Sequence, residues 1–130
     1  MQNIAAELGE TPFTTATGGF CILVWFVLWT RQTGVQNVAF NYPRVVEHGE
    51  YWRLLTSVYS HLSTAHIVSN MVSLWNLRVI EVLIGTLEYM RLTLMLVVLS
   101  TLFETLAYHV MLHRLGHGAI RNTWVLGYSG

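Results

Sequence analysis

A serine and a histidine–asparagine pair are the residues in this sequence whose types and spacing could carry chemistry. Ser129 lies between Gly127 and Gly130, and glycines beside a serine let a backbone approach its hydroxyl closely. His66 and Asn70 are four residues apart, so a helix places both on one face. Hydrolysis by a serine needs a nucleophile, a base and donors aimed at the developing oxyanion. An imidazole N–H and a side-chain amide are suitable donors.

Each of these features also has a purely structural interpretation. The pattern Gly-x-Ser-Gly arises by chance in about one chain in twenty to thirty of this length. It also differs from the nucleophile elbow of soluble hydrolases, whose second glycine lies two residues after the serine. Ser129 alone could be a small packing residue at a helix crossing. His66 and Asn70 could be a hydrogen-bonded pair between two membrane helices.

The composition indicates a membrane protein of one domain. The chain has 130 residues, of which 53% are hydrophobic and 11% are charged. Ordinary soluble domains carry about 25% charged residues. The seven basic and seven acidic residues balance, so there is no basic surface for nucleic acid. The single cysteine, Cys21, lies in an apolar run and is most simply a small buried hydrophobe.

The hydropathy pattern predicts three spanning segments and the start of a fourth. About 17 to 20 apolar residues cross a hydrocarbon core of roughly 30 Å. Thr11–Thr30 is the first such segment. Leu54–Leu77 is the second; His61 is expected before its helix and His66 and Asn70 inside it, with an end between Arg78 and Gly85. Tyr89–Leu112 is the third. Another apolar segment begins at Trp124.

The polar residues of the spans and the connecting segments have simple interpretations. Gln32–Glu50 has a turn-forming composition with scattered apolar residues, which predicts a loop lying partly in the membrane interface. His113–Thr123 has the composition of an aqueous loop. Trp25 and Trp29 are typical of an aromatic belt. Glu104 falls in the middle of the third span and is expected to face the bundle interior.

Four motifs, in order along the chain, resemble those of the rhomboid intramembrane serine proteases. The first resembles the Glu-x-Trp-Arg motif of that family's first loop, the second its second-helix motif, the third the element that closes this helix, and the fourth its nucleophile motif. They are Glu50-x-Trp52-Arg53, His61-x4-His66-x3-Asn70, Glu81-x3-Gly85 and Gly127-x-Ser129-Gly130.

The resemblance implies an all-α fold, a polytopic transmembrane helix bundle. Three full helices and the start of a fourth, out of a six-helix core, are expected. Residues 1–13 would be a short extramembrane tail and residues 14–130 a partial rhomboid domain. The implied substrates are transmembrane segments of membrane proteins, cut within the lipid bilayer without a cofactor or a metal ion.

The resemblance also implies a role for each motif residue. Ser129 would be the nucleophile, and its backbone N–H would form the oxyanion hole with His66 and Asn70. The remaining residues would support the site or anchor the first loop in the interface. Those supporting the site are His61, Gly127 and Gly130, and those anchoring the loop are Glu50, Trp52 and Arg53.

The sequence departs from the family pattern in two places. The interval from Asn70 to Glu81 is one residue shorter than expected, which bears on the end of the second helix. The family's general base is a histidine on the sixth helix, and the chain ends before the fifth. The resemblance gives no catalytic function to the histidines that precede the serine, which are His109, His113 and His117. The 130 residues alone are therefore expected to be inactive.

Two other functions remain open at this point. One is a catalytically inactive rhomboid-like protein that binds transmembrane clients. The other is a histidine-based metal carrier, which has little support because the histidines lack an acidic or cysteine partner at ligand spacing.

The charges and the resemblance indicate opposite orientations, and we follow the resemblance. The distribution of arginines would place the first and third loops in the cytosol. The resemblance instead places the first loop on the extracytosolic side, and it suggests a secretory-pathway membrane, the endoplasmic reticulum or the Golgi.

Overall fold

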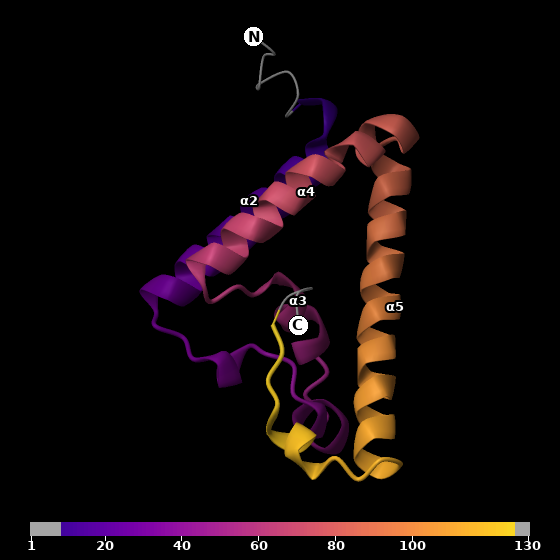
Figure 1. The fold of residues 1–130 in the computed structure, drawn as a ribbon. Coiled ribbons are helices and arrows are strands. Elements are labelled where there is room, and N and C mark those ends of the chain that lie inside the picture. Colours follow the sequence, from indigo (N-terminus) through magenta and orange to yellow (C-terminus); the bar gives the residue numbers. More distant parts are fainter. Residues whose placement is uncertain (1–8, 127–130) are drawn as a thin grey trace.

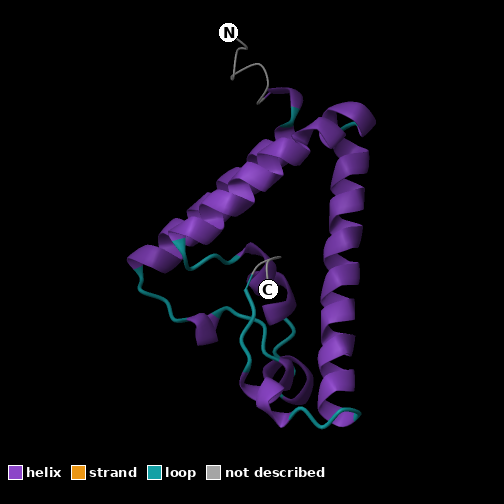
Figure 2. Cartoon of the chain, viewed as in Figure 1, coloured by secondary structure: helices purple, strands orange, loops and turns teal. Residues whose placement is uncertain are grey.

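The computed structural model of the chain describes residues 9–126, and it is built from helices and the loops that join them (Figures 1 and 2). From Pro12 to Asn122, three long α-helices, one short α-helix and three short helical turns follow one another. In order, they are α2 (Pro12–Thr30), η1 (Val35–Asn37), η2 (Pro43–Glu47), α3 (Arg53–Tyr59), α4 (Thr64–Ile84), α5 (Thr86–His113) and η3 (Gly118–Asn122). In the described range the only strand-like pairing is an isolated bridge.

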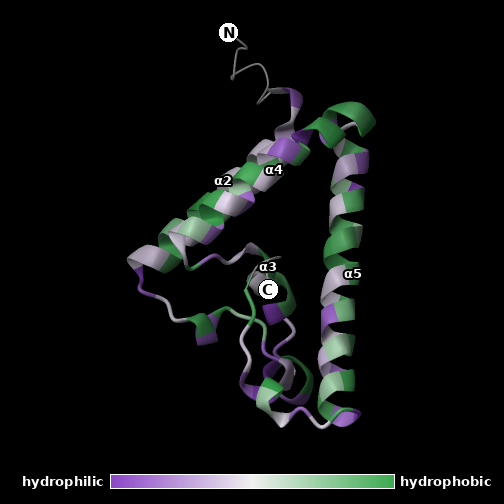
Figure 3. Cartoon of the chain, viewed as in Figure 1, coloured by the Kyte–Doolittle hydropathy of each residue, from purple (hydrophilic) through white to green (hydrophobic). Residues whose placement is uncertain are grey.

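The three long helices are apolar and long enough to cross a membrane. Figure 3 shows hydrophobic residues along most of their lengths. Many of these side chains are not covered by protein, for example Leu83, which is 77% exposed, and Phe103, which is 74% exposed. Exposed leucine and phenylalanine on this scale require an apolar surrounding. The predicted all-α membrane fold and its three spans are confirmed.

Helices α2 and α4 lie side by side (Figure 1). A glutamate of α4 caps the beginning of α2. The first turn of a helix has backbone N–H groups without partners inside the helix. Thr11, the N-cap residue, makes no side-chain cap. Glu81 takes this role: its carboxylate accepts from the N–H of Phe13 at 2.9 Å and that of Thr14 at 2.8 Å, and from Oγ1 of Thr14 at 2.7 Å. With only 1% of Glu81 exposed, this cap is shielded from solvent.

A sharp turn at Gly85 separates α4 from α5. Its φ of +85° favours glycine, and its N–H donates to the carbonyl of Glu81 at 2.8 Å. Helix α5 begins at the next residue and diverges from the α2–α4 pair (Figure 1). The end of α4 therefore lies where the sequence predicted it, despite the shortened interval from Asn70 to Glu81.

The second predicted segment, Leu54–Leu77, contains two helices, and the membrane-spanning one begins after His61, as expected. The chain forms α3, leaves helical geometry at Ser60 and resumes as α4 at Thr64. Ser63 caps the new helix by accepting from the N–H of His66 at 3.2 Å. The break, Ser60-His61-Leu62-Ser63, contains neither glycine nor proline.

The first loop carries a small hydrophobic core of its own. Phe40, Tyr42 and Val45 are at most 2% exposed. They pack against residues of α3, α5 and the C-terminal segment, namely Leu54, Tyr108, Leu112 and Val125. These three residues are buried in protein, and the expectation that the loop lies partly in the membrane interface stays a prediction. Tyr51 and Trp52 remain exposed on its surface.

Candidate active site

His61 and Asn70 form a hydrogen-bonded pair at the beginning of α4. Nε2 of His61 lies 2.7 Å from Nδ2 of Asn70, and Nδ1 of His61 lies 3.2 Å from the carbonyl oxygen of Tyr59. An amide nitrogen only donates and a carbonyl only accepts, so the pattern assigns the proton to Nδ1 and leaves Nε2 as the acceptor. Both nitrogens of the neutral imidazole are used. The ring thereby fixes the direction of the Asn70 amide.

Burial keeps this imidazole neutral. His61 is only 3% exposed. Burial lowers the pKa of His61 and the nearby His66 lowers it further, while the Tyr59 carbonyl opposes them. The amide nitrogen of Asn70 carries two hydrogens, and His61 takes one. No described residue is seen to take the other, which can therefore donate to a substrate oxygen.

The ring of His66 completes this cluster. Its centroid lies 4.9 Å from that of His61, with the two rings nearly perpendicular. His66 and Asn70 are both partly exposed and lie on successive turns of α4. Two side chains that can donate hydrogen bonds therefore lie together in the first two turns of a membrane-spanning helix.

Arg53 is a buried side chain that binds several parts of the first loop. It is 4% exposed, and its Nη1 donates to the carbonyls of Gln36 and Ala39, each at 3.0 Å. Its Nε pairs with Glu50, and its guanidinium lies 4.4 Å from the centre of the Trp52 ring. The hydrogen bond from Arg53 is the main cause that lowers the pKa of Glu50. Glu50, Trp52 and Arg53 thus form one connected group that closes the loop on itself.

The first loop also holds the segment that precedes the predicted nucleophile. Phe40 and Val125 exchange two backbone hydrogen bonds, of 2.9 and 3.0 Å. Nδ2 of Asn41 donates to the carbonyls of Arg121 and Thr123, each at 3.0 Å. These contacts join positions about 80 residues apart. The sequence does not indicate these contacts, because neither the first loop nor the segment before the nucleophile has a strand pattern. Asn41 also belongs to no motif.

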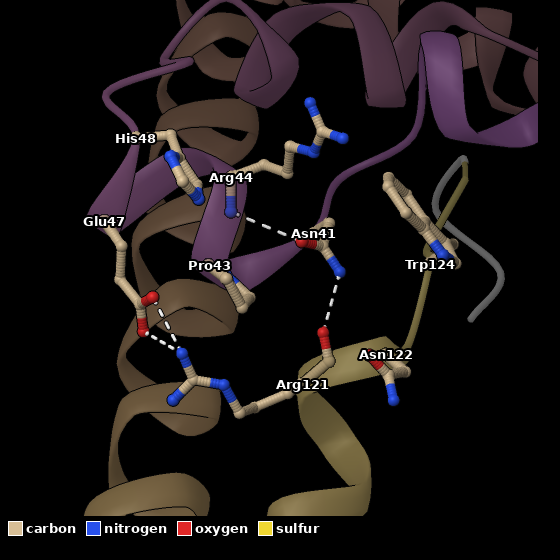
Figure 4. Close-up of a pocket in the computed structure, with 8 residues that line it drawn as sticks. All are labelled: Asn41, Pro43, Arg44, Glu47, His48, Arg121, Asn122 and Trp124. Atoms are coloured by element: carbon tan, nitrogen blue, oxygen red, sulfur yellow. Dashed lines mark hydrogen bonds and ion pairs between the residues drawn. The ribbon is translucent and has the colours of Figure 1, made fainter.

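An open polar cavity of about 280 Å³ lies between the loop and this segment (Figure 4). On one side of it, Nη2 of Arg121 lies 2.7 Å from both carboxylate oxygens of Glu47. Trp124 lines the other side, 5.8 Å from the guanidinium carbon of Arg53. The cations that line the cavity are thus largely matched by carboxylates, as Arg44 is by Glu50.

The histidines of α5 have contacts that hold the helix to the first loop. Nδ1 of His109 lies 2.7 Å from the Tyr42 hydroxyl, and the rings of His109 and His113 are 4.7 Å apart. Burial, with the nearby charge of Glu47, raises the pKa of Tyr42, so its hydroxyl stays protonated. Residues 9–126 contain no group of three or more histidine, cysteine, aspartate or glutamate side chains suited to a metal ion.

All of the predicted site residues lie within the described range except those of the last motif. The structure brings His61 together with His66 and Asn70, and it connects Glu50 with Trp52 and Arg53 as described above. Gly127, Ser129 and Gly130 lie outside the described residues. Leu126, the last described residue, follows directly on the segment that the first loop holds.

The model of the Rhomboid domain matches residues 48–130, which is well over half of the chain. The matched range contains all four motifs, from Glu50 to Gly130. Comparison with curated proteins and with solved structures found no match. With three membrane-spanning helices and a Rhomboid domain over most of its length, the chain belongs to the rhomboid family of membrane proteins.

Proposed function

We propose that the chain carries the nucleophile and the oxyanion-binding residues of an intramembrane serine endopeptidase. The observation that supports this most is the pair formed by His61 and Asn70. A buried, neutral imidazole fixes the amide of Asn70 while leaving one of its hydrogens for a ligand. Preorganised donors of this kind stabilise a developing oxyanion, and they do so most strongly where water is excluded.

The proposed reaction begins with attack by Oγ of Ser129 on a peptide carbonyl. The carbonyl carbon becomes tetrahedral and its oxygen takes the negative charge, which Asn70, His66 and the N–H of Ser129 stabilise. The general base takes the serine proton and passes it to the leaving amine as the intermediate collapses to an acyl-enzyme; water then hydrolyses the ester, which releases the carboxylic acid and restores the serine hydroxyl. The general base is assigned to none of these 130 residues, so the chain alone is expected to be inactive.

The position of the donors along α4 supports transmembrane segments as substrates. Helix α4 begins at Thr64, so His66 and Asn70 lie within about 9 Å of its start at 1.5 Å per residue. This depth is close to the aqueous boundary. A substrate helix has its carbonyls bonded internally, so a segment that unwinds near this boundary would expose one to the serine.

The test is cleavage of a transmembrane substrate by the complete product of the coding sequence, reconstituted in liposomes. We expect cleavage by the natural protein and none by the Ser129→Ala variant. Ser73→Ala is the matched control: this serine lies on α4, exposed, and bonds only the carbonyl of Ser69 among the described residues. Clients that are bound but not cut by the natural protein would instead favour the inactive client-binding function.

A further inference from the structure

The first loop and the segment from Arg121 to Val125 are joined by four contacts of different kinds. These are the paired backbone of Phe40 and Val125, the two hydrogen bonds of Asn41, the ion pair between Glu47 and Arg121, and the Trp124 ring near Arg53. Such a set fixes both the position of the segment and its direction, since the backbone pair is antiparallel.

Asn41 is the centre of this junction (Figure 4). It is 4% exposed. Its amide nitrogen donates to two carbonyls of the segment, and its Oδ1 accepts from the N–H of Arg44 at 3.3 Å. The Asn41 side chain thus caps the start of η2 and also holds the Arg121–Val125 segment by two hydrogen bonds. Its neighbour across the cavity, Asn122, is exposed and makes no side-chain hydrogen bond with the described residues.

The junction ends just before the predicted nucleophile. Ser129 follows Val125 by four residues, and an extended chain spans at most about 3.6 Å per residue, so Ser129 lies within about 14 Å of Val125. Because the first loop holds Val125 in place, the positions that Ser129 can occupy are limited. Phe40, Asn41 and Glu47 all precede residue 48, where the family match begins.

We infer that Asn41, with the Glu47–Arg121 ion pair, is a positioning group for the nucleophile: the first loop acts as a platform that directs Ser129 toward His66 and Asn70. The role rests on the proposed function, in which Ser129 is the nucleophile. In this role the first loop places the nucleophile, in addition to making its internal contacts.

The test measures the position of residue 129 directly, without relying on cleavage. In a Cys21→Ala background, Ser129→Cys and His66→Cys are joined by a short thiol crosslinker in membranes. We expect the parent pair to crosslink and Asn41→Ala to lower the initial rate about tenfold, because two hydrogen bonds to the segment are lost. Asn122→Ala, the matched control, should leave the rate unchanged.

Two further measurements separate positioning from general loss of structure. Hydrogen exchange should accelerate at the Val125 amide in Asn41→Ala, while the amides of α4 stay protected. Glu47→Arg should slow crosslinking by about twofold, as expected for an exposed pair, and adding Arg121→Glu should restore the rate.

The possible outcomes distinguish the two proposals. Crosslinking in the parent that is equally fast in Asn41→Ala and Glu47→Arg would overturn the positioning role and leave the proposed function standing. Absence of crosslinking in the parent, with Val125 still protected from exchange, would overturn the proposed function, and the role of Asn41 toward the serine would fall with it.

Discussion

Replacing Glu81 with glutamine tests whether the cap across two helices holds the bundle together. The carboxylate accepts from two backbone N–H groups and one hydroxyl of the first turn of α2. A glutamine of the same shape retains one acceptor oxygen and turns its NH₂ group toward a donor. At least one N–H of Phe13 or Thr14 then lacks a partner.

The structure permits an estimate of the cost. A buried donor left without a partner costs about 1–3 kcal/mol. The lost negative charge at a helix N-terminus adds about 0.3–1 kcal/mol, and more where it is partly buried. We therefore expect Glu81→Gln to lower the free energy of unfolding by about 2–4 kcal/mol, close to a third of the stability of a typical domain.

Reversible unfolding in mixed micelles, followed by circular dichroism over increasing mole fractions of a denaturing detergent, measures this change. Glu88→Gln is the control, since Glu88 pairs only with Arg91 on the surface and both side chains are more than half exposed. Glu88 lies in the first turn of α5, so the loss of its charge and its exposed pair should cost at most about 1 kcal/mol. If the two variants were equally stable, the Glu81 cap would not be the link between α2 and α4.

Three other predictions concern the loop, the histidine pair and the serine. Arg53→Ala should increase hydrogen exchange throughout the first loop, because two carbonyls and Glu50 lose a buried partner, whereas Arg44→Ala, which removes an exposed partner of the same Glu50, should have little effect. His61 has a pKa below its ordinary value in the folded state, so the unfolded state takes up a proton first as the pH falls. The free energy of unfolding should therefore fall as the pH drops below about 6.5. In detergent unfolding, His61→Gln should make this pH dependence shallower. A fluorophosphonate probe should not label Ser129 in the 130-residue chain, because the proposed site assigns the general base to none of these residues, and labelling detected by mass spectrometry would contradict this assignment.

The spans could be predicted from the sequence because their signal is local. Twenty apolar residues in a row need a hydrocarbon environment whatever their neighbours are. The expected first span, Thr11–Thr30, therefore differs from α2 by one residue. Gly85 could also be predicted, since a glycine after an apolar run is a local stop signal.

The tertiary contacts could not be predicted in the same way. Glu81 appeared to be part of the turn that closes α4, but its carboxylate caps a helix that begins nearly 70 residues earlier. The interruption between Ser60 and Ser63 contains neither glycine nor proline. Within it, the buried His61 bonds both the Tyr59 carbonyl and Asn70, contacts that only the packed structure reveals.

The candidate site shows the same division. The spacing of His66 and Asn70 on one helix, with His61 just before it, singles out these residues, and the structure places them together. Asn41 was not selected, because a single asparagine in a loop carries no periodic signal. Its importance appears only when the segment after α5 returns to the first loop.

The most direct test of the account is the distance between Ser129 and the two donors of α4 in the membrane. Cysteine pairs that join position 129 to position 66, 70 or 72, each in the Cys21→Ala background, can be compared by the rate of crosslinking with a short reagent. Val72 is 56% exposed and lies on a different face of α4, so it serves as the control. The account predicts rapid crosslinking from 129 to 66 and to 70 and little to 72. Crosslinking to 72 alone, or to none of the three, would contradict the assignment of Ser129, His66 and Asn70 to one active site.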